Sequence, residues 1–153
     1  MKAAKAGGGG EKTRAPRSAY DRVGGLVYFA RMLDKIRLHA AGRLPAAYHK
    51  NLGVGFDGRL VRFLRVDYRV LRDLVLQGGK DEELLRWCFE QGRRPNEEEI
   101  MIWNSFMVKR GWRDEADGST QELNGYKAAS GLSQRHDLVT FFDYYDVDEG
   151  RAP

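Results

Sequence analysis

The stretch DEELLRWCFEQGRRPNEEEIMIWNSFMVKRGW, residues 81–112, contains all three tryptophans of the chain and predicts two helices joined by a short turn. Asp81 is a suitable N-cap, because its carboxylate can accept hydrogen bonds from the free amides of a first helical turn. Gly92 is placed to end the first helix. Asn96 and Glu99 have the spacing of a capping box, which would begin the second. We expect this pair to form the centre of a small, mostly helical domain.

The rest of the chain carries further helical patterns. Apolar side chains recur at helical spacing from Phe29 to about Ala41, and again around Phe141 and Tyr145. Residues 60–64 could form a strand or a helical turn; we favour the turn, since no partner strand is evident and an isolated strand leaves its backbone unpaired. We therefore predict an all-α fold, a single-domain bundle of about five helices with irregular connections over residues 18–153.

Length and composition bound the class of protein. A chain of 153 residues with 42% hydrophobic residues is long enough for one domain with a real core. The longest apolar run, Leu26 to Ala30, is too short to cross a bilayer, so we expect no membrane partner. Cys88 is the single cysteine, which excludes an internal disulfide; among large apolar neighbours it should behave as a buried hydrophobe. We expect a cytoplasmic protein.

The positive charge is concentrated near the N-terminus. Residues 1–17 hold five Lys/Arg and one Glu, which accounts for the whole net charge of +4. The segment includes four consecutive glycines, residues 7–10, and few apolar side chains, so we predict a disordered basic arm. Such an arm could tether nucleic acid or another polyanion. A solubilising tail without a specific role is the favoured alternative.

The remainder of the chain is electrically bipolar. Residues 22–72 hold eleven Lys/Arg and three Asp, whereas residues 73–149 hold nine basic and seventeen acidic residues. The basic half contains five arginines at spacings of three or four: Arg59, Arg62, Arg65, Arg69 and Arg72. On a helix they would form a basic stripe that could bind phosphates or an acidic protein. The alternatives are internal pairing, simple solvation or head-to-tail self-association through the two charged halves.

A second candidate site is polar and contains two histidines. Its residues are Asp34, Arg37, His39, Tyr48 and His49. A histidine could serve there as acid or base, or the histidines and the carboxylate could hold a metal. The spacing matches no metal signature such as His-Glu-x-x-His, and the chain contains neither a phosphate-binding loop nor a Gly-x-Ser-x-Gly turn. We therefore predict no metal and no cofactor; a boundary histidine and an exposed one are the plainer interpretation.

The C-terminal stripe ends in acid. Four carboxylates are clustered there, Asp143, Asp146, Asp148 and Glu149, without the spacing or central glycine of a calcium loop. Because acid at the end of a helix opposes the helix dipole, we expect basic partners for the cluster. Candidates by charge are Arg31, Lys35 and the Arg59–Arg72 set.

Three stretches together resemble a known bacterial family. They are YFARMLDKIRLHAAGRLPAAYH (residues 28–49), Phe56–Arg59 leading to LRVDY (residues 64–68), and FFDYYDVDEGR (residues 141–151). The sequence is similar to a family described only as a domain of unknown function, number 5069. The resemblance covers about residues 18–151 and implies a single compact domain. It implies no activity and no role for any residue.

The sequence favours a non-enzymatic binding module that contacts an acidic protein or an anionic ligand through its Arg-rich half. The residues expected to contribute are Arg37, Arg59, Arg62, Arg65 and Arg69. The runner-up is a small enzyme, or a ligand- or metal-binding protein, that uses His39, Tyr48 and His49. Binding of nucleic acid through residues 1–17 ranks third.

Overall fold

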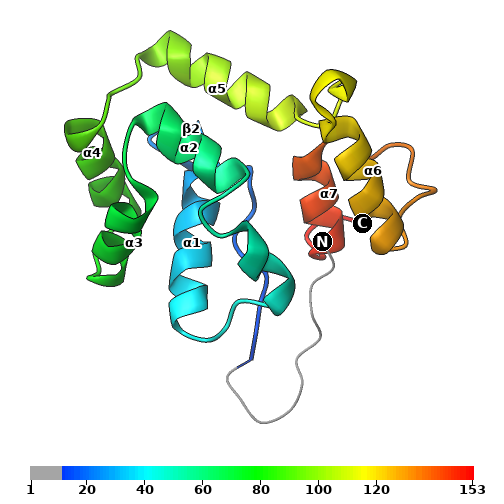
Figure 1. Ribbon diagram of the computed structural model, residues 1–153, viewed down its shortest axis with the longest axis horizontal. Coiled ribbons are helices and arrows are strands. Elements are labelled where there is room, and N and C mark those ends of the chain that lie inside the picture. The colour runs from blue at the N-terminus through cyan, green and yellow to red at the C-terminus, as the bar shows by residue number, and fades with distance from the viewer. Residues whose placement is uncertain (1–11) are drawn as a thin grey trace.

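The computed structural model describes residues 12–153, which form a mostly helical domain (Figure 1). None of its helices is long and apolar enough to cross a membrane. Within these residues there are seven α-helices, two short 3-10 helices and one two-stranded sheet. In chain order they are β1 (Arg22–Val23), β2 (Leu26–Val27), α1 (Phe29–Ala40), η1 (Ala46–Asn51), α2 (Phe56–Leu64), α3 (Tyr68–Leu76), α4 (Asp81–Gln91), α5 (Glu97–Lys109), η2 (Glu115–Asp117), α6 (Ser119–Ala129) and α7 (Phe141–Asp148).

Helix α1 forms the centre of the domain, whereas we expected residues 81–112 there. Nine of its twelve residues are buried, including charged Arg31 and Lys35. In Figure 1, α1 lies between α3 and α4 on one side and α7 on the other. Helix α5 buries only Trp103 and Met107, so it packs as an outer layer. Counting tryptophans was misleading, because Trp112 is half exposed.

The predicted pair of helices is confirmed, with one change at its start. Helix α4 begins after Lys80 as the N-cap, so Asp81 is its first residue. At the start of α5, the Glu99 amide donates to Asn96 Oδ1 and the Asn96 amide donates to Glu99 Oε1, as the capping box requires. Gly92 follows the last residue of α4, and this position requires glycine because a Cβ there would lie 1.9 Å from the Leu64 carbonyl oxygen.

Residues 60–64 are helical, as favoured from the sequence, but the helix is short. Helix α2 ends where Arg65 adopts a left-handed conformation, with φ of 57°. Asp67 then caps α3 by accepting from the Val70 amide over 3.0 Å. This break divides the arginine-rich segment into two helices. It is one reason why the described residues contain seven helices where we predicted about five.

A small hairpin makes the fold mostly helical instead of all-α. Strands β1 and β2 pair antiparallel around Gly24 and Gly25, both of which have positive φ. The hairpin is fixed to α5 by Asn104, whose side chain accepts from the Val27 amide and donates to the Gly25 carbonyl. A two-residue strand leaves almost no periodic signal, so the sequence did not reveal it.

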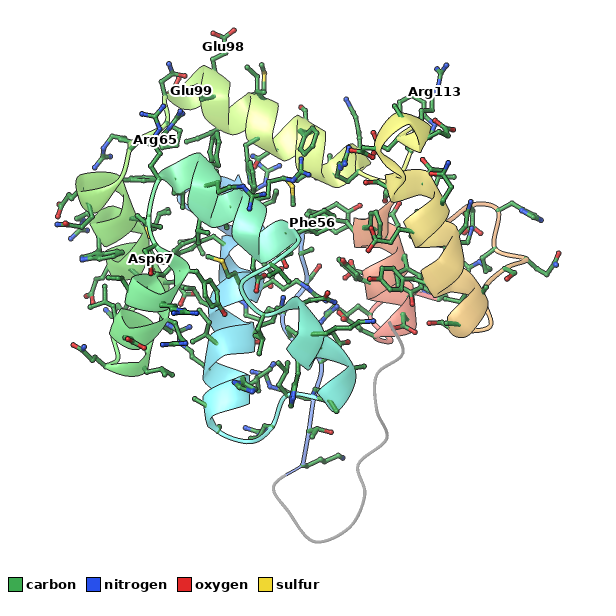
Figure 2. The ribbon with its side chains drawn as sticks, viewed as in Figure 1. Phe56, Arg65, Asp67, Glu98, Glu99 and Arg113 are labelled. Atoms are coloured by element: carbon green, nitrogen blue, oxygen red, sulfur yellow. The ribbon has the colours of Figure 1, made fainter. Side chains whose placement is uncertain are left out.

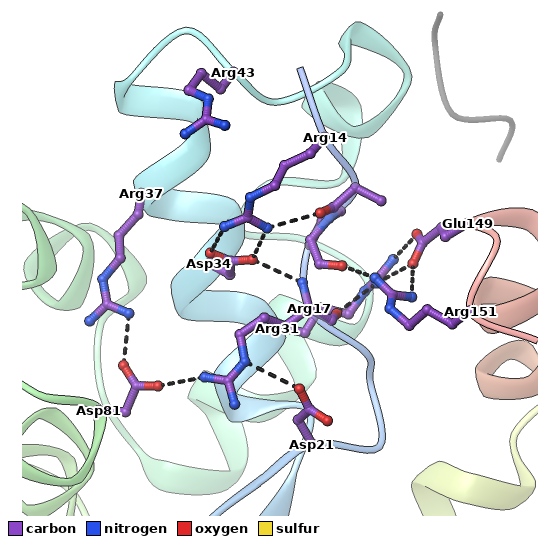
Figure 3. A network of polar contacts seen from close by, with 12 residues as sticks. Arg14, Arg17, Asp21, Arg31, Asp34, Arg37, Arg43, Asp81, Glu149 and Arg151 are labelled. Carbon is purple, nitrogen blue, oxygen red and sulfur yellow. Dashed lines mark hydrogen bonds and ion pairs between the residues drawn. The ribbon is translucent and has the colours of Figure 1, made fainter. Parts of the chain in front are cut away.

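The end of the predicted basic arm is packed on α1 (Figure 3). Residues 1–11 lie outside the described part of the chain, and their disorder stays a prediction. Arg14 pairs with both carboxylate oxygens of Asp34, at 2.7 and 2.9 Å. Arg17 pairs with Asp81 over 2.9 Å and thereby joins the N-terminal segment to α4. The packed domain therefore starts a few residues before residue 18.

Candidate anion-binding site

A cavity lies where α1 and α2 face α6 and α7. Its volume is about 210 Å³. Helix α1 contributes the inner wall, α2 and the end of α5 contribute one side, and α6 and α7 contribute the other. Phe56 lies at the end of α2 that approaches α7 (Figure 2). Because residues as far apart in the chain as Tyr28 and Tyr145 line the cavity, no local motif indicates it.

The cavity is strongly cationic. Five of its lining residues carry positive charge, and Glu122 is the one acidic residue among those that line it. The cations are Arg31, Lys35, Arg59, Arg62 and Arg110. They differ in how far the protein itself compensates them.

Arg31 is buried and paired. Its Nη1 and Nη2 donate to the two carboxylate oxygens of Glu149, both over 2.8 Å (Figure 3). Tyr48 Oη donates to Glu149 over 2.7 Å. Burial alone would raise the pKa of Glu149, but hydrogen bonds and charge from Arg31, with help from Tyr48 and Arg151, hold that pKa below its usual value. This contact confirms the predicted basic partner for the C-terminal acidic cluster.

Lys35 is the second buried and paired cation. Its Nζ lies 2.9 Å from Asp57 Oδ1, which also accepts from Tyr28 Oη over 2.7 Å. The other oxygen of Asp57 accepts from the Gly53 amide. Burial lowers the pKa of Lys35 despite the attraction of Asp57. The pair fastens the start of α2 to α1.

Arg110 is buried and only partly satisfied. It forms ion pairs with Asp114, over 3.1 Å, and with Asp117. Its Nε is buried and has no hydrogen-bond partner among residues 12–153.

Arg59 differs from these three because it has no ion pair within residues 12–153. Its Nε is also buried without an acceptor in that range. Its guanidinium stacks 4.8 Å from the centre of the Phe106 ring. Burial lowers the pKa of Arg59, and the charges of Arg110 and Arg62 lower it further. Arg62 is exposed at the cavity and is likewise unpaired within the described chain.

Aromatic rings also line the cavity. The Phe56 ring packs edge to face against Phe141, with centroids 5.4 Å apart, and Tyr126 packs against Phe141 at 6.1 Å. Tyr145 lies beside them, with its ring 4.5 Å from the Arg31 guanidinium. The lining of the cavity therefore combines cations with aromatic rings.

The predicted arginine stripe is wrong as a continuous feature. Arg59 and Arg62 on α2 face the cavity, whereas Arg69 and Arg72 on α3 line a separate groove. Arg65 lies near Glu99 at the start of α5 (Figure 2). The left-handed turn at Arg65 separates the two pairs, because helical spacing holds only within one helix.

The histidine constellation is only partly assembled. His39 and His49 contact each other edge to face, with ring centroids 4.8 Å apart, and both are exposed. Tyr48 is buried and its hydroxyl is used by Glu149, away from the histidines. Arg37 pairs with Asp81 over 2.7 Å. Within residues 12–153 no three His, Cys, Asp or Glu side chains are grouped to hold a metal.

The sequence pointed to some cavity residues and missed others. Arg59 and Arg62 were among the predicted binding residues, and Arg31 and Lys35 were named only as partners for acid. Arg110 and Tyr126 were not among the predicted residues. The usable clue was chemical: Arg31 and Lys35 are charges on the helix with the strongest burial, and buried charges need partners.

These features define a mostly helical domain with a small cationic and aromatic cavity. The chain belongs to the family described as Domain of unknown function (DUF5069), whose model matches residues 13–151. A search of curated proteins gives no match.

Proposed function

We propose that this protein is a binding module for a small anionic ligand, held in the cavity between α1, α2, α6 and α7. The observation that carries the proposal is Arg59. A partly buried guanidinium that is crowded by Arg62 and Arg110, and that forms no ion pair among residues 12–153, is stabilised when an anion binds. A guanidinium is also the side chain best suited to hold a carboxylate or phosphate by two parallel hydrogen bonds.

The size and the walls of the cavity limit the ligand. A volume of about 210 Å³ is below the roughly 300–1,000 Å³ of pockets for drug-sized molecules. The rings of Phe56, Tyr126 and Phe141 add an apolar surface to the cavity that the arginines line. A compact ligand with one phosphate or carboxylate and a short apolar or aromatic body matches this lining.

Calorimetric titration tests this proposal. The probes are inorganic phosphate and phenyl phosphate, added to the wild type and to the double variant Arg59→Gln/Arg62→Gln. We expect saturable binding by the wild type, tighter for phenyl phosphate, and at least a tenfold loss in the variant. The matched control is Arg65→Gln/Arg69→Gln, which removes two exposed arginines outside the cavity and should bind like the wild type. Equal weakening by both double variants would reduce the effect to net charge and refute a specific site.

Other expectations remain proposals of lower rank. A role for His39 and His49 in catalysis or ligand binding is supported only by their mutual contact. Nucleic-acid binding by the arm depends mainly on residues outside the described range, because Arg14 and Arg17 are already used in ion pairs. We also propose a cytoplasmic location, which the single buried cysteine supports. A bacterial origin is proposed from the resemblance of the three sequence stretches alone.

A further inference from the structure

The outer face of α5 is apolar in the middle and oppositely charged at its two ends. We define this face by Glu98, Met101, Ile102, Ser105 and Lys109, which follow one another at intervals of one, three or four residues. All five are exposed, and Met101 and Ile102 each expose 57% of their surface. The buried residues of α5, Trp103 and Met107, lie on the opposite side. The face is therefore a continuous stripe along the helix.

The charges at the ends of the stripe are not neutralised by other residues between 12 and 153. Glu98 and Lys109 form no ion pair with another residue between 12 and 153. Figure 2 shows Glu98 projecting outward at one end of α5 and Arg113 projecting outward just beyond the other end. Glu98 and Lys109 are separated by about 17 Å along the helix axis, at 1.5 Å for each residue.

We propose that this face binds the same face of a second copy of the protein, with the two α5 helices antiparallel. A two-fold axis near the middle of α5 places Glu98 of each copy opposite Lys109 of the other. The same axis brings Met101 and Ile102 of one copy onto the central part of its partner's helix. A patch that is apolar at its centre and carries opposite charges at its ends is complementary to itself in this orientation only. A parallel pairing would oppose like charges at both ends.

The exposed apolar residues support a second copy as the occupant. Met and Phe are enriched at the centres of protein interfaces. Phe106 borders the stripe and is 39% exposed even though Arg59 and Arg110 cover part of its ring. The inference is independent of the proposed ligand, because none of the five residues of the stripe lines the cavity.

Sedimentation over a range of concentrations tests the antiparallel pairing through a charge exchange. The single variants Glu98→Lys and Lys109→Glu should each associate at least tenfold more weakly than the wild type, since each opposes like charges at both ends. An equal mixture of the two variants should recover association, because the mixed pair again has opposite charges at both ends. Weakening of each single variant together with recovery in the mixture is not expected from a parallel pairing, because like charges already face each other there in the wild type.

A control and a contrary result complete the test. Glu97→Lys makes the same charge change in the same helical turn, about 100° around the helix from Glu98, and should associate like the wild type. Thermal unfolding of each variant verifies that it is folded. A wild type that is monomeric at about 1 mM, or a mixture that fails to associate better than its components, overturns the proposal.

Discussion

Two groups of cations that line the cavity differ in burial and in ion pairing. Arg31 and Lys35 are almost completely buried, and each has a carboxylate of its own, Glu149 or Asp57. Arg59 and Arg62 are more exposed and form no ion pair with a carboxylate within residues 12–153. The first group holds α1 to α7 and α2, and its charge is already neutralised. The difference separates residues that maintain the fold from residues that remain available to a ligand.

The largest expected effect comes from removing the charge of Glu149. Glu149→Gln leaves the Arg31 guanidinium buried without a counter-ion, so the free energy of unfolding should fall by about 3–5 kcal/mol. Denaturant unfolding measures the change. Asp73→Asn, which breaks the exposed pair with Arg72, is the control and should cost less than about 0.5 kcal/mol. Similar values for the two variants would remove the distinction between the two groups of cations.

Lys35→Met should have the next largest effect, about 2–3 kcal/mol of unfolding free energy. The methionine replaces the apolar stem of Lys35 and leaves Asp57 buried with two remaining donors, Tyr28 and the Gly53 amide. Those donors make the loss smaller than for Glu149→Gln. The same denaturant experiment measures it, and a stabilised variant would show that the burial of Lys35 costs more than its pairing returns.

Acid should weaken the stabilisation that the Arg31–Glu149 ion pair gives the fold. The folded protein holds the pKa of Glu149 below its usual value of 4.5, so the ionised carboxylate contributes stability above that pH. The contribution is lost as the pH falls from 4.5 through the lowered pKa. Between pH 7 and pH 3, the free energy of unfolding of the wild type should therefore fall more than that of Glu149→Gln. Parallel curves would show that Glu149 titrates normally and that its pair with Arg31 is weak.

Arg59→Gln should have the smallest effect on stability. Loss of an unpaired cation relieves repulsion from Arg62 and Arg110, so unfolding free energy without ligand should change by less than about 0.5 kcal/mol. The stabilisation that phosphate gives the wild type should disappear in this variant. Thermal melts with and without phosphate measure both quantities. A large loss of stability without phosphate would place Arg59 among the residues that maintain the fold.

Features that depend on residues close together in the sequence could be predicted, whereas contacts between distant segments could not. The bounds of α1, the pair α4 and α5, and the reciprocal cap of Asn96 with Glu99 follow from patterns within a dozen residues. A basic partner for the C-terminal acidic cluster followed from charge, because acid at a helix end needs a cation, and Arg31 was one of several candidates. In contrast, the hairpin at Gly24 and the centrality of α1 depend on contacts with remote segments.

The residues that line the cavity were likewise only partly predictable from the sequence. Arg59 and Arg62 share a face at a spacing of three, which a sequence displays. That Arg110 and Tyr126 meet them depends on the turn after α5 and on the packing of α6 against α7. The division of the arginine set at Arg65 likewise follows from one residue with positive φ, an uncommon conformation for a side chain other than glycine.

Nitrogen-15 NMR of the arginine side chains during a phosphate titration tests the central claim most directly. The Nε–H group of Arg59 is buried and lacks an acceptor among residues 12–153, so an anion in the cavity should change its resonance more than that of any exposed arginine. We predict a saturable shift for Arg59, while Arg65 shifts only slightly and without saturation. A resonance of Arg59 that does not move, or that moves in parallel with Arg65, would contradict an anion site in this cavity.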